Sequence, residues 1–147
     1  RPLYPLSWWR WRNTGGLHLK KRGQEAGGEV DLFPRFRWGM PMAAMKGKAK
    51  ALLERALAQL QVESSQETLD AFDSYLGLLR KWSRAYNLTA LRDEEEIVRK
   101  HFIDSLSYLR AVPEGAGTLL DVGTGAGFPG VPLKIARPGL EVFLLEP

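Results

Sequence analysis

The chain has 147 residues, of which 44% are hydrophobic and 26% charged, a composition typical of about one soluble globular domain. The absence of cysteine excludes disulfide and thiolate chemistry, and the two histidines, His18 and His101, are too far apart in sequence to indicate a metal site. No apolar run reaches the roughly 18–20 residues of a membrane span, so we expect no membrane association.

The basic charge is confined to the start of the chain. Residues 1–42 hold eight Lys/Arg and three Asp/Glu, a net charge of +5, whereas residues 43–147 hold 13 and 14, a net charge of −1. Residues 7–12 concentrate Trp and Arg, and scattered Gly and Pro break every structural period in this part. The sequence predicts a leader over 1–42 that is disordered or not native coding sequence. The alternative is an RNA-binding module that uses the charge and stacking of its Arg and Trp side chains.

A helical region is predicted over residues 43–112. Apolar residues between Ala49 and Leu60 recur at the spacing of an amphipathic helix. Ser64 and Glu67 match the S-x-x-E capping box, which predicts the start of a second helix that runs to about Tyr86.

Asp93 and Glu96 repeat this capping pattern before a third helix, predicted from Glu94 to about Arg110. His101 and Asp104 lie near the apolar face of this helix. A single histidine in such a position is more often a packing or hydrogen-bonding residue than a catalytic one.

Residues 113–147 read as a strand, a glycine-rich loop, a helix and a second strand. The first strand carries Asp121 near its end, and the four glycines that follow are Gly123, Gly125, Gly127 and Gly130. A short helix is predicted from about Val131 to Ala136, and a second strand from Glu141 to Leu145. This order aims backbone N–H groups and a helix N-terminus at a ligand, and Asp121 is expected to accept hydrogen bonds from it.

Two cofactor classes fit this loop. Gly125, Gly127 and Gly130 satisfy the dinucleotide fingerprint G-x-G-x-x-G, which would indicate a nicotinamide-dependent oxidoreductase. Asp121 disfavours a pyrophosphate because the two charges would repel, and it suits S-adenosylmethionine, which carries a sulfonium, an ammonium and ribose hydroxyls. In either class Glu146, after the second strand, is the expected acceptor for ribose hydroxyls.

From about Lys50 to Glu146 the chain resembles the small-subunit ribosomal RNA methyltransferase G family, RsmG or GidB. The most specific match is the loop, in which Phe128-Pro129-Gly130 extends a generic methyltransferase motif. The matching stretches are Tyr75 to Trp82, Asn87 to Ala90 with Arg92 and Asp93, Lys100 to Leu106, and Asp121 to Leu133.

The resemblance implies an α/β protein in which a helical N-terminal region precedes a Rossmann-like methyltransferase fold. It implies a monomeric, cytoplasmic bacterial enzyme that uses S-adenosylmethionine to methylate N7 of a guanine in 16S rRNA, within the small (30S) subunit. Carried over to this sequence, the cofactor positions are Gly123, Gly125, Gly127, Phe128 and Glu146, and the motif positions with substrate or structural roles are Asn87, Arg92, His101 and Asp104. No catalytic base is assigned.

The sequence ends at Pro147, directly after the second predicted strand. A doubly wound sheet needs further parallel strands and crossover helices. We therefore expect an N-terminal fragment with an incomplete sheet that binds cofactor weakly or not at all and does not turn over.

Overall fold

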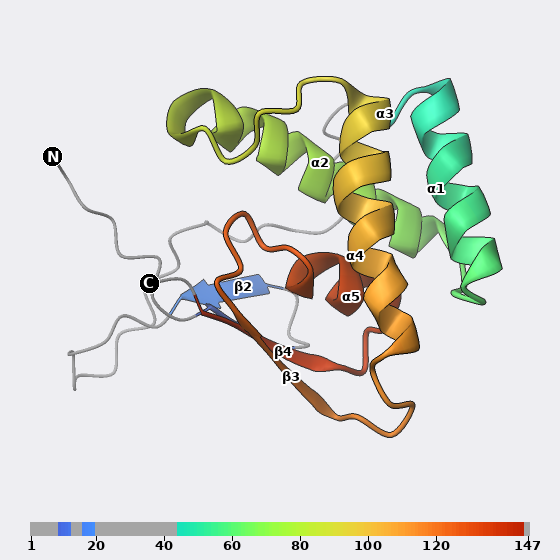
Figure 1. Ribbon diagram of the computed structural model, residues 1–147, viewed down its shortest axis with the longest axis vertical. Coiled ribbons are helices and arrows are strands. Elements are labelled where there is room, and N and C mark those ends of the chain that lie inside the picture. The colour runs from blue at the N-terminus through green and yellow to red at the C-terminus, as the bar shows by residue number, and fades with distance from the viewer. Residues whose placement is uncertain (1–8, 13–15, 20–43, 146–147) are drawn as a thin grey trace, which may run out of the picture.

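A computed structural model describes residues 9–12, 16–19 and 44–145 of the chain (Figure 1). Helices form one layer, and a mixed sheet lies below them with a short helix between (Figure 1). The elements in chain order are β1 (Trp9–Arg12), β2 (Gly16–Leu19), α1 (Gly47–Gln59), α2 (Gln66–Tyr86), α3 (Glu94–Ile97), the π-helix η1 (Val98–Ile103), α4 (Asp104–Ser107), the 3₁₀-helix η2 (Tyr108–Arg110), β3 (Thr118–Val122), α5 (Gly130–Ala136) and β4 (Glu141–Leu145).

The helical layer is built from the apolar stripes that the sequence shows. Leu53 and Leu57 of α1 and Phe72 and Leu76 of α2 are buried, and Phe102 of η1 packs between them. The ring centroids of Phe72 and Phe102 are 5.3 Å apart, a distance typical of attractive aromatic pairs. The three predicted helices are confirmed. In the part of the chain that is described, no helix is both long and apolar enough to cross a membrane.

The helix starts differ in how well the sequence locates them. The predicted cap at Ser64 is wrong by one residue, because α2 begins at Gln66 and the side chain of Ser65 accepts a hydrogen bond from the Thr68 backbone N at 3.2 Å. Glu67 then falls in the first turn, where its charge complements the helix dipole. The cap at Asp93 is confirmed, since its carboxylate accepts from the Glu96 backbone N at 3.0 Å.

The third predicted helix contains a π-helical turn, η1, between α3 and α4. A π-turn inserts an extra residue relative to the α-helix and rotates the side chains around it. Phe102 is fully buried there, and the neighbouring His101 is half-buried. Both rings lie against Phe128 of the glycine-rich loop, with centroid distances of 6.3 Å for Phe102 and 4.6 Å for His101.

The sheet has the order β2-β1-β4-β3. β3 and β4 are parallel, are joined through α5 and align Val122 with Leu145 at their C-terminal ends, whereas β1 pairs antiparallel with β4. A small buried cluster is formed by Leu140, Val142 and Leu144. Leu119 of β3 and Val131 of α5 pack against it. The mixed α/β class with a parallel strand pair is confirmed, and a complete Rossmann-like sheet stays a prediction.

The first 42 residues contain β1 and β2, and no strand was predicted there. The rest of this leader lies outside the described residues, as does Glu146. The division of the chain at residues 42 and 112 stays a prediction.

Candidate functional site

The four glycines of the glycine loop (residues 123–130) form two pairs with different surroundings. Gly123 and Gly125 have φ values of +76° and +56°, in the left-handed region that favours glycine, and both are exposed. A Cβ atom built on either residue would meet no atom of the described residues within 4 Å. The backbone is therefore open on this side, and a ligand can approach it closely.

The other two glycines are needed for packing. A Cβ atom on Gly127 would lie 2.7 Å from Cγ2 of Val131 and 3.1 Å from the hydroxyl oxygen of Tyr75. A Cβ atom on Gly130 would lie 2.3 Å from Cδ2 of Leu144 and 2.8 Å from Oδ2 of Asp121. These two positions let the loop and the first turn of α5 lie directly on α2 and on the sheet.

Asp121 links the two ends of the glycine loop through its carboxylate. Its Oδ2 atom accepts a hydrogen bond from the Thr124 hydroxyl at 2.8 Å and another from the Gly130 backbone N at 2.8 Å. Both Asp121 and Thr124 are buried, with exposed fractions of 9% and 4%, so these bonds are shielded from water. The carboxylate therefore joins the end of β3 to the first residue of α5. A contact between Asp121 and a ligand stays a prediction.

Tyr75 of α2 supports the loop from the helical layer. Its hydroxyl donates a hydrogen bond to the backbone O of Ala126 at 3.0 Å, and its ring stacks on Phe102 at 5.4 Å. Burial, and to a lesser degree the charge of Asp121, raises the pKa of Tyr75 well above its ordinary value, so the hydroxyl stays protonated. The sequence alone assigns Tyr75 no role at the loop, and the only signal for one is a tyrosine, rather than a phenylalanine, beside an apolar stripe of α2.

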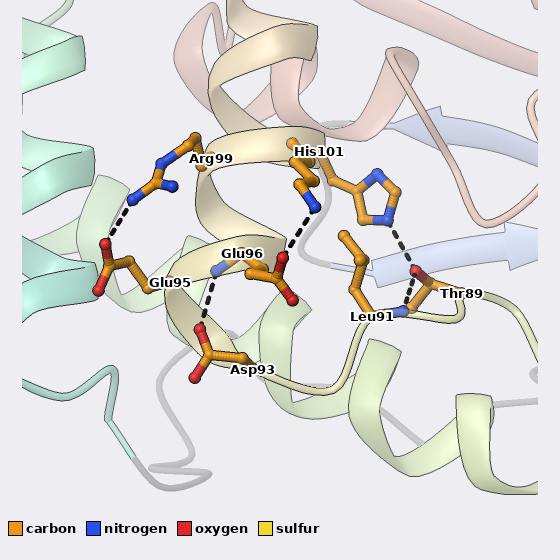
Figure 2. A network of polar contacts seen from close by, with 8 residues as sticks. Thr89, Leu91, Asp93, Glu95, Glu96, Arg99 and His101 are labelled. Carbon is orange, nitrogen blue, oxygen red and sulfur yellow. Dashed lines mark hydrogen bonds and ion pairs between the residues drawn. The ribbon is translucent and has the colours of Figure 1, made fainter.

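His101 of η1 lies at the edge of the loop. Its ring stacks on Phe128 with an interplanar angle of 20°, and its Nε2 atom is 2.7 Å from the Thr89 hydroxyl oxygen. The same oxygen accepts a hydrogen bond from the Leu91 backbone N at 3.2 Å, so Thr89 joins the loop after α2 to η1 (Figure 2). Burial lowers the pKa of His101 and so favours the neutral ring. The charge of Asp104 opposes this effect but is smaller.

Two exposed ion pairs lie along the same helical segment (Figure 2). Arg99 pairs with Glu95, and Lys100 pairs with Glu96 at 2.8 Å, each four residues along the helix. Among the described residues no group of three metal-binding side chains is present.

The remaining predicted residues lie apart from the glycine loop or outside the described part. Asn87 ends α2 in the left-handed conformation with φ of 51°, and its N–H donates to the Ser83 backbone O at 3.1 Å. Arg92 is exposed and lines a pocket beside the end of α2, and Asp104 is exposed on α4. Glu146 lies outside the described residues.

These residues lie in a segment that matches a known protein family. A family model described as "rRNA small subunit methyltransferase G" matches residues 68–147, more than half of the chain. The chain belongs to this family. The match begins in α2 and includes Tyr75, the Thr89–His101 pair and the whole glycine loop.

Curated relatives from several bacteria carry the name "Ribosomal RNA small subunit methyltransferase G". The Acetivibrio thermocellus protein is 44% identical over 99 residues, which cover 67% of this chain and 41% of the relative. The Chromobacterium violaceum protein is 49% identical over 98 residues, covering 65% of this chain and 46% of the relative, and a Geobacter protein is 47% identical over 98 residues, covering 67% and 45%. The chain thus matches less than half the length of these relatives.

Proposed function

We propose that this chain carries part of the S-adenosylmethionine site of an rRNA methyltransferase, and that the open faces of Gly123 and Gly125 receive the cofactor. The observation that carries the proposal is the open, left-handed backbone at these two glycines, within the segment matched by the methyltransferase family. Glu146 would accept hydrogen bonds from ribose hydroxyls, since it directly follows β4 and the parallel strands β3 and β4 end side by side.

The loop fits S-adenosylmethionine better than a nicotinamide dinucleotide. In a dinucleotide-binding loop the N-terminus of the following helix faces the pyrophosphate. Here the Gly130 N–H, at the start of α5, donates to Asp121, and the carboxylate adds a negative charge at that helix end. Both features disfavour a pyrophosphate, whereas a cationic ligand with hydroxyl groups tolerates them.

The residues of this chain would act by position rather than by proton transfer. When bound, S-adenosylmethionine supplies a methyl group activated by its sulfonium. Asp121 fixes both ends of the loop through Thr124 and Gly130, and Tyr75 fixes its middle at Ala126, which reduces the motion of the open glycines. Phe128, held between Tyr75 and His101, presents a partly buried ring beside them. The expected contribution to rate is therefore proximity and orientation.

We further propose guanine N7 of 16S rRNA in the small ribosomal subunit as the methyl acceptor. The family match and the names of the relatives support small-subunit rRNA as the substrate, and N7 of guanine is carried over from the resemblance to the family. We propose a cytoplasmic location and a monomeric state together with this substrate.

A chimera tests the proposed activity. The segment of the Chromobacterium violaceum relative that matches this chain is replaced by the corresponding residues of this chain, and transfer of labelled methyl groups to small subunits is measured. We expect 7-methylguanosine in digested small-subunit rRNA and its loss in Gly123→Arg. Gly139→Arg, at an exposed turn with open space around it, is the matched control and should keep activity. Activity that survives Gly123→Arg, or a different methylated position, would contradict the proposal.

A further inference from the structure

A pocket that includes no residue of the glycine loop lies between the C-terminal end of α2, the loop that follows it and α3. Its volume is about 140 Å³, several times the roughly 30 Å³ that one water molecule occupies in the liquid. The residues that line it are Arg80, Ser83, Arg84, Thr89, Leu91, Arg92 and Ile97. Three of these seven carry a guanidinium group, which makes the pocket strongly basic in a part of the chain whose net charge is slightly negative.

The three arginines are not equally engaged. Arg80 forms an ion pair with Glu94, whose side chain is only 17% exposed. Among the described residues, Arg84 and Arg92 form no hydrogen bond and no ion pair, and both side chains are exposed. The pocket therefore keeps an excess of about two positive charges after the Arg80–Glu94 pair is counted.

A buried hydroxyl group adds a second, independent observation. Ser83 is 1% exposed, lines the pocket, and its Oγ atom has no hydrogen-bond partner among the described residues. Leaving a buried hydroxyl unpaired costs free energy, so such a group indicates a partner that is supplied from outside the fold. Next to two unpaired guanidinium groups, the matching partner is an anion with several acceptor oxygens.

We propose that this pocket binds a phosphate group, with Arg84 and Arg92 pairing with its oxygens and Ser83 donating its hydroxyl. Guanidinium groups recognise phosphate through paired hydrogen bonds, and a serine hydroxyl can supply a further donor. The phosphate comes either from an RNA backbone or from a free nucleotide. This site goes beyond the proposed methyl transfer and does not depend on it.

The site is also connected to the glycine loop. Thr89 lines the pocket and forms the 2.7 Å contact with Nε2 of His101, whose ring stacks on Phe128. A phosphate in the pocket therefore lies one side chain away from the residues that support the glycine loop.

The test is a nuclear magnetic resonance titration of the full 147-residue chain that follows the side-chain Nε–Hε signals of its arginines. The probes are inorganic phosphate, adenosine 5′-monophosphate, adenosine and a short single-stranded oligoribonucleotide. We expect the signals of Arg84 and Arg92 to shift saturably with every probe except adenosine. Arg55, exposed on α1 and remote from the pocket, is the control and should not move.

Three variants measure the contribution of each group. Arg84→Gln and Arg92→Gln should each weaken phosphate binding about tenfold and lower the salt dependence of oligoribonucleotide binding by roughly 0.7 in the log–log slope, whereas Arg55→Gln should leave both unchanged. Ser83→Ala should weaken binding several-fold and at the same time raise the melting temperature, because the unpaired hydroxyl is removed. A merely structural serine would not change these two quantities in opposite directions.

The outcomes separate the two sources of phosphate. Tight binding of the oligoribonucleotide with competition by inorganic phosphate identifies an RNA backbone, and binding of the monophosphate without the oligoribonucleotide identifies a nucleotide. Either result supports the pocket. It is overturned if neither Arg84 nor Arg92 shifts with inorganic phosphate, or if Arg55→Gln weakens binding as much as Arg84→Gln does.

Discussion

Replacing Asp121 with alanine should loosen the glycine loop, because one carboxylate oxygen joins β3 to α5 through two buried hydrogen bonds. Without it the Gly130 N–H loses its acceptor in a buried position, which costs about 1–3 kcal/mol. The Thr124 hydroxyl can rotate towards another acceptor, and its loss is about 0.5–1.5 kcal/mol. Together, Asp121→Ala should lower the free energy of unfolding by about 2–4 kcal/mol, a large share of the roughly 5–15 kcal/mol of a typical domain.

Asp121→Asn is the matched control for this prediction. Both donors meet the same oxygen, Oδ2, so the single carbonyl oxygen of asparagine can keep both bonds without the charge. Charge-assisted hydrogen bonds are about twice as strong as neutral ones, so we expect a loss of about 1–2 kcal/mol, and about 1 kcal/mol for Thr124→Val, which removes one bond. The assay is urea denaturation followed by circular dichroism. Equal stability of Asp121→Ala and the unchanged chain would refute the reasoning.

Three further predictions use the same denaturation assay. Gly130→Ala should lower the free energy of unfolding by about 1–3 kcal/mol, because its Cβ would lie 2.3 Å from Leu144. Gly123→Ala should lower it by only about 1 kcal/mol, through backbone strain. The reverse order would contradict the division of the glycines into two pairs. The pKa of His101 is lowered in the folded state, so stability should fall as the pH drops from 6.5 through that lowered value, and His101→Gln should flatten this dependence; an unchanged slope would count against it. Lys134 is 7% exposed and donates to the backbone O atoms of Pro138 at 2.6 Å and Leu140 at 2.9 Å. Lys134→Met should therefore lower the free energy of unfolding by about 1–3 kcal/mol. An unchanged free energy of unfolding would show that these bonds contribute nothing net.

The elements of this fold that depend on local sequence could be predicted. The apolar spacing in α1 and the acidic cap at Asp93 are local signals, and the structure agrees with them. Two neighbouring serines made the cap of α2 ambiguous, because Ser64 offers the capping-box pattern and Ser65 the geometry that the helix uses. The π-turn at His101 has no local signal, since it depends on how the helix packs against its neighbours.

The sequence located the glycine loop, but it did not show how the residues of the loop contact one another and the rest of the fold. Asp121 was expected to face a ligand, and the structure shows its Oδ2 atom bonded to the loop itself. Gly123 and Gly127 look alike in sequence, yet only Gly123 has open space around it. Tyr75 reaches the loop from a helix about 50 positions earlier, a contact across the sequence that spacing alone does not predict.

Titration of S-adenosylmethionine into the isotope-labelled chain tests the assignment of the cofactor site most directly, because nuclear magnetic resonance detects weak binding residue by residue. We expect the backbone amide signals of Gly123 and Gly125 to shift saturably, while those of Gly115 and Gly139, which are equally open but distant from the loop, stay in place. NADH should leave all four unchanged. If S-adenosylmethionine does not move Gly123 and Gly125, or if NADH moves them more, these glycines do not hold this cofactor.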